Sequence, residues 1–265
     1  LGQMGRYAEA ELLHERALAI YEKALGPEHP NVATALSTLA DIYDERGRST
    51  EAERLHKRAL AIGEKVLGPG HPVVGAYLHS LGGNYLRQGR FTEADPIYKR
   101  ALAIREQALG PDHPDVGFTL NDLAYLYMAS GRYVEAETLF RRALTIFEKA
   151  FGLQDARVAT ALDNLAFNYG MQRQFDSALS LVFRTLSNYE PRNRDFSLSV
   201  LSGALDEGRI SPAQAFSASY KALQLGYASA ASAAVRQLAQ RYAAGSGELA
   251  MLVRRDQDLA AEDSA

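Results

Sequence analysis

The fold is decided by a short stretch that occurs three times: Gly26-Pro27-Glu28-His29-Pro30, Gly68-Pro69-Gly70-His71-Pro72 and Gly110-Pro111-Asp112-His113-Pro114. The copies are evenly spaced along the chain, and Gly152 follows at one more step of the same length. A second marker has the same period, because Gly-Arg dipeptides begin at residues 5, 47, 89 and 131. Two independent markers therefore define one 42-residue internal repeat.

Between the two markers, apolar residues recur with helical spacing. Leu36, Leu39, Ala40 and Tyr43 lie at i, i+3, i+4 and i+7, and the pattern returns in the following repeats. We name this segment helix A, and the segment after the Gly-Arg turn, which has its own helical stripe, helix B. The turn glycine fits a position of positive φ after helix A, and the linker proline fits the first turn of the next helix A. Each repeat is thus predicted to be an antiparallel helix pair.

Small residues occupy fixed places in both helices, where a leucine would overpack the contact by about 1–3 kcal/mol. They are Ala40, Gly82, Ala124 and Ala166 in helix A, and Ala10, Ala52, Ala94, Ala136 and Ala178 in helix B. This pattern resembles the tetratricopeptide repeat (TPR). The 42-residue step and the Leu-Gly-Pro-Asp-His-Pro linker resemble the repeats of kinesin light chain and its bacterial relatives. The resemblance implies an all-α, right-handed TPR superhelix, or solenoid.

We predict two regions. Residues 1–190 form the TPR array, with a partial repeat at 1–25 and helix pairs at about 32–67, 74–109, 116–151 and 158–188. Residues 191–265, where the period is lost, form a helical C-terminal cap with helices near 212–225, 228–243 and 247–260. The array is expected to fade in its fourth repeat, where Arg173 replaces the turn glycine, Thr185 replaces an alanine, and Gln154-Asp155-Ala156 replaces His-Pro.

At the other end, residues 1–5 match only the end of a helix A. We therefore expect that an upstream repeat has been removed. The first helix B would then lack its partner, so that Leu12, Leu13 and Ile20 would be exposed and would favour self-association.

Composition excludes several classes of function. The 265 residues are 47% hydrophobic and 23% charged, with a net charge of −3, which is ordinary for a globular protein and gives no basic footprint for nucleic acid. Cysteine is absent, so the chain has no disulfide and no thiol nucleophile. Neither a membrane span nor a secretory leader is found, and we expect a cytoplasmic protein.

The histidines do not indicate a metal or an active site. His29, His71 and His113 share one linker position, and His14 and His56 share one position in helix B. One histidine per repeat separates them by about a helix-pair width, and helices alone are about 10–12 Å across, far more than zinc–nitrogen bonds of about 2.0–2.1 Å. We predict structural roles. No hydrolase, nucleotide-binding or zinc-protease motif occurs, so we expect no enzyme, no metal and no cofactor.

The resemblance implies that helix-A positions 2, 5, 9 and 12 line a concave groove. From these positions we select seven candidate binding residues: Ser37, Asp41, His79, Asn121, Tyr125, Asp163 and Phe167. Asn121 resembles the asparagines that peptide-binding arrays use on ligand backbone, since one amide can donate and accept. The alternative for the aromatic residues is packing against the next repeat or the helices after residue 190.

The predicted function is a protein-interaction scaffold that binds a peptide or partner protein. Two alternatives stay open. Residues 234–245 and 249–259 resemble the connector of bacterial proteins that carry a CHAT domain, a caspase-like protease, which implies a regulatory role. The other alternative is a self-association module. Arg6, Arg48, Arg90 and Arg132 form a ladder that either binds acidic partners or consists simply of exposed turn residues.

Overall fold

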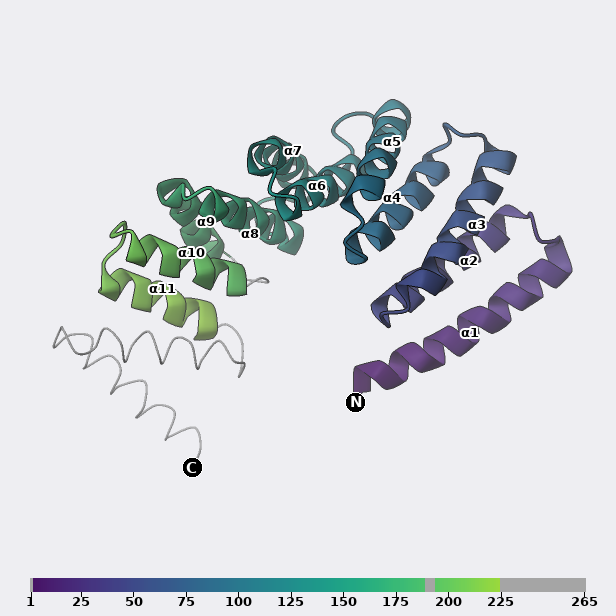
Figure 1. The fold of residues 1–265 in the computed structure, drawn as a ribbon, viewed down its shortest axis with the longest axis horizontal. Coiled ribbons are helices and arrows are strands. Elements are labelled where there is room, and N and C mark those ends of the chain that lie inside the picture. The colour runs from purple at the N-terminus through teal and green to yellow at the C-terminus, as the bar shows by residue number, and fades with distance from the viewer. Residues whose placement is uncertain (1, 189–193, 225–265) are drawn as a thin grey trace. The chain divides into compact units, whose positions relative to one another are not determined.

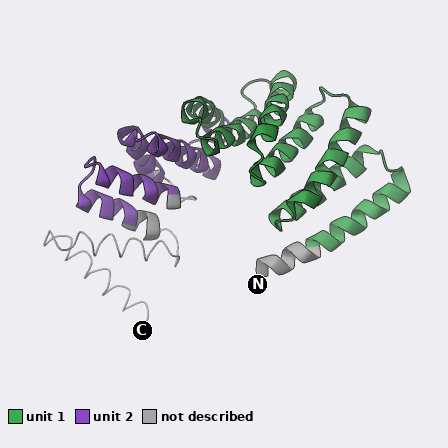
Figure 2. Cartoon of the chain, viewed as in Figure 1, with its two compact units in different colours: residues 1–146 green, residues 147–265 purple. Residues whose placement is uncertain are grey.

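The computed structural model describes residues 2–188 and 194–224, which form eleven helices and no strand (Figure 1). The chain divides into two compact units, residues 1–146 and 147–265, with the boundary inside the seventh helix (Figure 2). The helices are α1 (Gly2–Leu25), α2 (Pro30–Glu45), α3 (Ser49–Leu67), α4 (Pro72–Arg87), α5 (Phe91–Leu109), α6 (Pro114–Ala129), α7 (Tyr133–Phe151), α8 (Ala156–Met171), α9 (Phe175–Asn188), α10 (Arg194–Asp206) and α11 (Pro212–Gln224). The all-α class is confirmed.

The repeats appear as alternating helices. The A helices α2, α4, α6 and α8 begin at the regular step of the sequence repeat, at residues 30, 72, 114 and 156, and a B helix follows each of them. Within unit 1, each helix from α1 to α6 packs on the next one, and α4 also contacts α2 and α6 (Figure 1). Ala40, Ala52, Ala94 and Ala124 are completely buried, as the small-residue pattern predicts.

One of these small positions requires glycine. A Cβ atom at Gly82 would lie 3.0 Å from the ring of Tyr98, which is fully buried under it. Glycine therefore provides the space for a large side chain on the facing helix.

The turn between helices A and B keeps its geometry where the sequence departs from the pattern. Gly131 has a φ of +77°, and the N–H of Arg132 donates to the carbonyl of Tyr127 at 2.8 Å. In the fourth repeat Arg173 takes a φ of +59°, and the N–H of Gln174 donates to the carbonyl of Tyr169 at 2.9 Å. The expected fading is therefore absent from this turn, although a non-glycine residue now bears the strain of positive φ.

The same turn returns after α10. Gly208 has a φ of +69°, and the N–H of Arg209 donates to the carbonyl of Ala204 at 2.8 Å. The helices on either side, α10 and α11, pack on each other and on α9, and α10 also packs on α8. They form a further helix pair with altered spacing, because α10 begins earlier than the regular step from α8 would place it. The helix predicted near 212–225 is α11, whereas those predicted at 228–243 and 247–260 lie outside the described residues.

Helix α1 exposes the apolar residues that were expected to lack a partner. Leu12, Leu13 and Ile20 are 66%, 59% and 55% exposed. Ile62, which occupies the place of Ile20 in the next repeat, is buried against Val32 and Leu36 of its own helix A. The side of α1 that is exposed is therefore equivalent to the side of α3 that helix A covers in the following repeat.

Candidate functional site

The linker histidines cap helices. Each Nδ1 atom accepts a hydrogen bond from the backbone N–H two residues further on, at 3.1, 3.2 and 3.1 Å for His29, His71 and His113. In the fourth repeat a carboxylate oxygen of Asp155 accepts from the N–H of Arg157 at 2.8 Å. The predicted structural role of these histidines is confirmed, and an aspartate performs it in unit 2.

The turn arginines connect neighbouring repeats. The guanidinium carbons of Arg48, Arg90 and Arg132 lie 4.0, 4.3 and 3.8 Å from the ring centres of Tyr43, Tyr85 and Tyr127. Arg90 also pairs with Glu93 in its own repeat and with Glu53 in the preceding helix B, both at 2.6 Å. These arginines therefore already have carboxylate partners and are more than exposed turn residues. The side chain of Arg6 is outside the described residues.

Glu53 shows how strongly the turn arginines engage acidic groups. Burial opposes its ionisation, but hydrogen bonds from Lys57, Arg90 and Gln88 prevail and lower its pKa to about 2. The carboxylate is thus stabilised by Lys57 of its own helix together with Arg90 of the following repeat.

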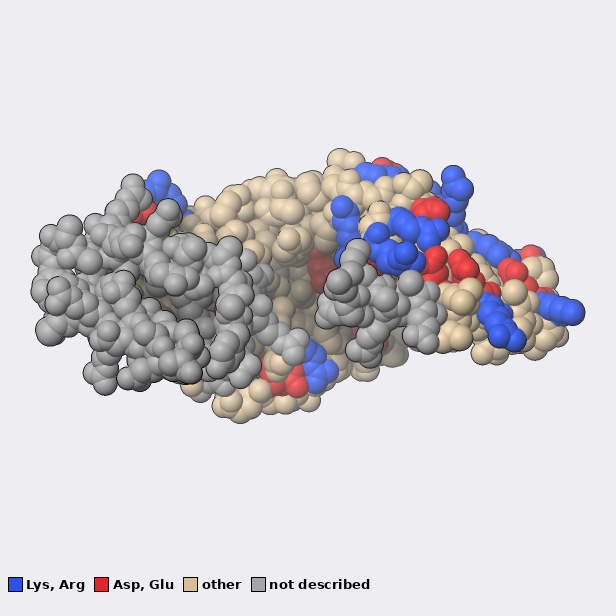
Figure 3. Space-filling model, turned by 90° about the horizontal axis from the view of Figure 1, so that it is seen from below, with Lys and Arg blue, Asp and Glu red and all other residues tan. Residues whose placement is uncertain are grey.

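A second set of ion pairs joins successive B helices. Arg58, Arg100, Arg142 and Arg184 pair with Glu22, Glu64, Glu106 and Glu148, at 2.5–2.6 Å. On the face drawn in Figure 3, blue basic and red acidic side chains lie next to one another on the right-hand part of the surface. These four arginines therefore hold repeats together and already have acidic partners.

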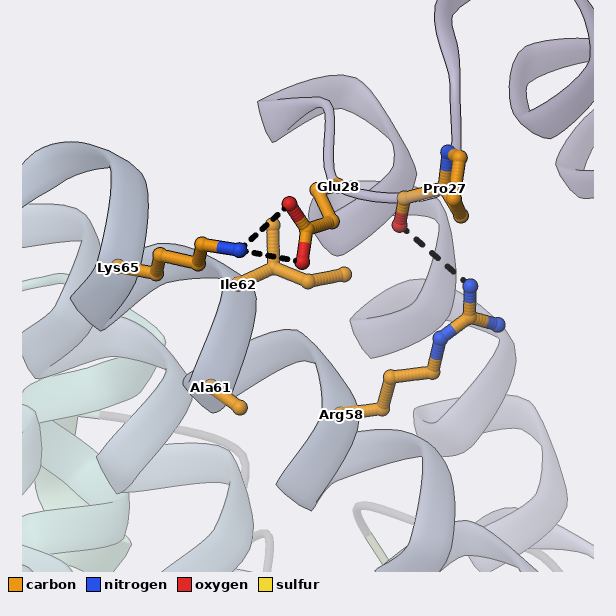
Figure 4. A pocket seen from close by; sticks show the side chains of 6 residues that line it. All are labelled: Pro27, Glu28, Arg58, Ala61, Ile62 and Lys65. Carbon is orange, nitrogen blue, oxygen red and sulfur yellow. Dashed lines mark hydrogen bonds and ion pairs between the residues drawn. The ribbon is translucent and has the colours of Figure 1, made fainter.

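A shallow pocket of about 370 Å³ lies between the first linker and α3 (Figure 4). Lys65 binds both oxygens of Glu28 at 2.6 Å, and Arg58 donates to the carbonyl of Pro27 at 3.4 Å. Because its polar groups bind one another, and Arg142 repeats the contact with the carbonyl of Pro111 at 3.2 Å, this pocket is a feature of the repeat.

A buried polar cluster joins α2, α3 and α4. His56 Nε2 lies 3.2 Å from Asp44 Oδ2, and Asn84 donates to Asp44 Oδ1 at 2.7 Å. All three side chains are less than 9% exposed. The cluster explains His56 as a structural residue, in agreement with its place in the repeat.

Three of the seven candidate binding residues are covered in the free chain. Ser37 and Asp163 are only 9% and 1% exposed. Phe167 is partly buried, and its ring stacks on Phe196 of α10 with the ring centres 4.0 Å apart. This stacking corresponds to the packing alternative considered for the aromatic residues.

The other four candidates are exposed or partly exposed residues of α2, α4 and α6 in unit 1. We call this surface, which comprises Asp41, His79, Asn121 and Tyr125, the helix-A face. Tyr125 is 39% exposed. Asn121 donates to Asp122 Oδ1 at 3.2 Å, and His79 Nε2 lies 3.2 Å from Asp122 Oδ2.

Asp41 is electrostatically distinct on this face. Its side chain is 59% accessible, yet the surrounding protein displaces enough water to raise its pKa. Attraction to His56, whose Nε2 is 3.8 Å away, opposes the shift, and the charge of Asp44 adds to it. The carboxylate would gain from a positively charged ligand.

Sequence reasoning missed two residues that complete this face. Asp122 joins His79 to Asn121, and Tyr98 reaches under α4, where its ring meets that of His79 edge-on at 5.7 Å. The sequence did carry a signal for Tyr98, because a glycine at the small position of helix A, Gly82, is followed by an aromatic residue in the next helix B. No such signal was present for Asp122, because it lies outside the four selected helix-A positions.

Among the described residues, no group of three or more His, Asp or Glu side chains is arranged to hold a metal ion. A search of those same residues finds no helix with the length and apolar character needed to cross a membrane.

Comparisons with known proteins agree with the repeat architecture. The tetratricopeptide repeat family model matches four overlapping segments, residues 1–65, 45–107, 73–149 and 117–190. No curated protein matches the chain. A crystal structure of kinesin light chain-like TPR repeats from Podosopora anserina is 29% identical, with a TM-score of 0.59, over 70% of this chain and 88% of that one.

Two more distant structures share the fold. BtubC from P. vanneervenii is 21% identical with a TM-score of 0.63, over 93% of this chain and 94% of that one. The apo form of RapI is 15% identical with a TM-score of 0.63, over 81% of this chain and 77% of that one. The predicted TPR superhelix is confirmed.

Proposed function

Because this chain belongs to the tetratricopeptide repeat family, we propose that it is a binding scaffold that holds a peptide or a segment of a partner protein on its helix-A face. One observation carries the proposal. The turn and helix-B arginines are paired between repeats, whereas the helix-A face presents an exposed aromatic ring and a carboxylate of raised pKa. The helix-A face therefore combines an exposed aromatic ring with an accessible carboxylate.

The chemistry of the face suits an extended peptide. The Asn121 side chain is oriented by Asp122, and an amide can pair with both N–H and C=O groups of a ligand backbone. Tyr125 supplies a partly exposed ring, and aromatic residues are frequent hot spots of binding. The proposal does not rest on Ser37, Asp163 or Phe167, which are covered in the free chain.

The test is to pan the full chain against a phage library of randomised twelve-residue peptides and to measure the affinity of enriched peptides by fluorescence anisotropy. Asn121→Ala should weaken binding about 2- to 13-fold, the worth of one hydrogen bond. Tyr125→Ala should cost more, and neither variant should lower the melting temperature. Val134→Ala, which trims a residue of α7 that is 72% exposed, is the control and should bind normally. A lower melting temperature with unchanged affinity would instead assign these residues to packing.

The proposal is a non-catalytic one. We expect broad peptidase and esterase panels to show no turnover, since histidines 29, 71 and 113 cap helices and His56 is buried beside Asp44. Activity that survives repurification and disappears on a single histidine or serine substitution would contradict this. Binding of nucleic acid is not expected at a net charge of −3.

Self-association is a second candidate, favoured by the exposed apolar residues of α1. The sedimentation coefficient should then increase with protein concentration, and Leu13→Lys should abolish that increase. If the variant associates equally, α1 is not the contact. The protease-regulatory alternative rests on residues 234–259, which lie outside the described residues, and it stays a prediction, as do the cytoplasmic location and bacterial origin.

A further inference from the structure

One repeat position has an unusual series of side chains along the helix-A face. Asp41, Gly83 and Tyr125 occupy this same position in three successive repeats, on the adjacent helices α2, α4 and α6. The central residue contributes no side chain. Of the described atoms outside the glycine's immediate chain surroundings, a Cβ at Gly83 would meet within 4 Å only the Tyr98 hydroxyl, at 3.6 Å. The surface is therefore open between an acidic and an aromatic residue.

The hydroxyl beneath Gly83 has an unmet hydrogen-bonding capacity. Tyr98 is 0% exposed, and its Oη atom has no hydrogen-bond partner among the described residues. Burial raises the pKa of Tyr98, so the hydroxyl keeps its proton and can both donate and accept. Because the hydroxyl is buried, it forms the floor beneath the open position at Gly83 and is not itself a contact for a ligand.

The charges around this position favour a cation. The Asp41 carboxylate is accessible, and its nearest described basic atom is His56 Nε2 at 3.8 Å. Asp122, next to His79, adds a second carboxylate. Arg87 is the positive charge on the same side of α4, and Glu45 pairs with it at 2.8 Å. The carboxylates of Asp41, Asp122 and Glu45 outnumber the single guanidinium of Arg87.

On the basis of the function proposed above, we propose that the open position at Gly83 takes an arginine or lysine side chain of the bound peptide. The cation lies near the Asp41 carboxylate and faces the exposed ring of Tyr125, over the position where Gly83 leaves room for it. Carboxylates and aromatic faces both attract such cations. The ligand is thus a peptide with a basic residue, and side chains of this chain recognise that residue.

Two substitutions, Gly83→Ala and Asp41→Asn, test this site without changing the rest of the helix-A face. Gly83→Ala fills the open position with one methyl group at ordinary contact distance from the Tyr98 hydroxyl, and alanine favours a helix, so the melting temperature should hold or rise. Asp41→Asn removes the accessible charge with little change in shape. The matched controls are Gly70→Ala in a linker, where a Cβ meets nothing described within 4 Å, and Glu28→Gln beside Lys65.

The experiment is to sequence the peptides that each variant enriches from the randomised twelve-residue library. The native chain and both controls should enrich peptides with arginine or lysine at one fixed position, and Gly83→Ala and Asp41→Asn should lose that preference. Replacing this arginine by neutral citrulline in a synthetic peptide should weaken binding to the native chain about 10-fold, and binding to Asp41→Asn by much less.

The outcomes distinguish the two proposals. Enriched peptides without a basic preference, or with an acidic or aromatic residue at the fixed position, overturn this inference and leave the scaffold function standing. A basic preference that persists in both variants also overturns it. Failure to enrich any peptide overturns the scaffold function and this inference with it.

Discussion

The repeats of unit 1 and the fourth repeat, in unit 2, build the same helix pair with different polar residues. In unit 1 the three described turn arginines, Arg48, Arg90 and Arg132, each stack on a tyrosine and pair with a glutamate three residues further on. In the fourth repeat the corresponding places hold Gln174 and Ser177, although Tyr169 remains and is buried. The helix pair therefore does not require the arginine ion pairs. Helix caps, the turn of positive φ and the match of small to large side chains are what the two regions share.

The largest expected effect comes from exchanging a packing pair between the two regions. Gly82 and Tyr98 in unit 1 correspond to Ala166 and Val182 in unit 2. Tyr98→Val should destabilise the chain by about 2–4 kcal/mol because it leaves a cavity. Gly82→Ala should cost about 1–3 kcal/mol, since its Cβ would lie 3.0 Å from the tyrosine ring.

The double variant copies the unit 2 pair and should be more stable than the sum of the single changes predicts, because the methyl group fills space left by the ring. Urea unfolding of the four proteins measures this coupling. Strictly additive losses would show that the two positions do not share a contact that matters for stability.

The next largest effect concerns acid stability in unit 1. Glu53 has a folded pKa of about 2 against 4.5 for the free side chain, so its contribution is complete above pH 4.5 and disappears as the pH falls towards 2. Glu53→Gln should cost about 1.5–3 kcal/mol at neutral pH, the worth of hydrogen bonds to a charged group. It should also flatten the pH dependence of local unfolding, measured by hydrogen exchange in α3 and α5.

Unit 2 supplies the control for this prediction. Leu179 occupies the place of Glu53 in the fourth repeat, so protection of α9 should change less over the same pH range. Equal acid sensitivity in α3 and α9 would indicate that other carboxylates dominate.

Most of the fold could be predicted because it depends on local and periodic features. The 42-residue step, helical stripes and linker prolines place four helix pairs, and the observed A helices begin slightly before the predicted starts. Helix α11 was predicted near 212–225, but its pairing with α10 was missed, although Gly208-Arg209 repeats the turn dipeptide, because the altered spacing removes the pair from the register.

The candidate site was less predictable because burial depends on neighbours. Ser37, Asp163 and Phe167 share register positions with residues of the helix-A face, but they are covered in this chain, Phe167 by Phe196. The role of Asp155 was also missed, since a departure from His-Pro suggested a fading repeat rather than an equivalent cap. Register predicts where a residue lies on a helix, and the next helix decides whether it is exposed.

A smaller effect is expected from exchanging the turn residues of the two regions. Gly131→Arg should destabilise the α6–α7 pair by about 1–2 kcal/mol, since a side chain is unfavourable at positive φ. Arg173→Gly should stabilise the α8–α9 pair by less than that, because glycine also gains freedom in the unfolded chain. Hydrogen exchange of the two helix pairs measures both effects. A loss of stability in Arg173→Gly would mean that the contact of Arg173 with Glu207 outweighs the backbone strain.

The smallest effect is expected at the helix caps, where the two regions use different residues for one task. His71→Ala and Asp155→Ala each remove the acceptor for an N–H at the start of helix A, and each should cost about 1 kcal/mol. His71→Asp should be nearly neutral at pH 7, because Asp155 shows that a carboxylate fits this position and a helix N-terminus favours negative charge. Local hydrogen exchange at the start of α4 and α8 gives the three values. If His71→Asp is as harmful as His71→Ala, the imidazole has a role in unit 1 beyond accepting this hydrogen bond.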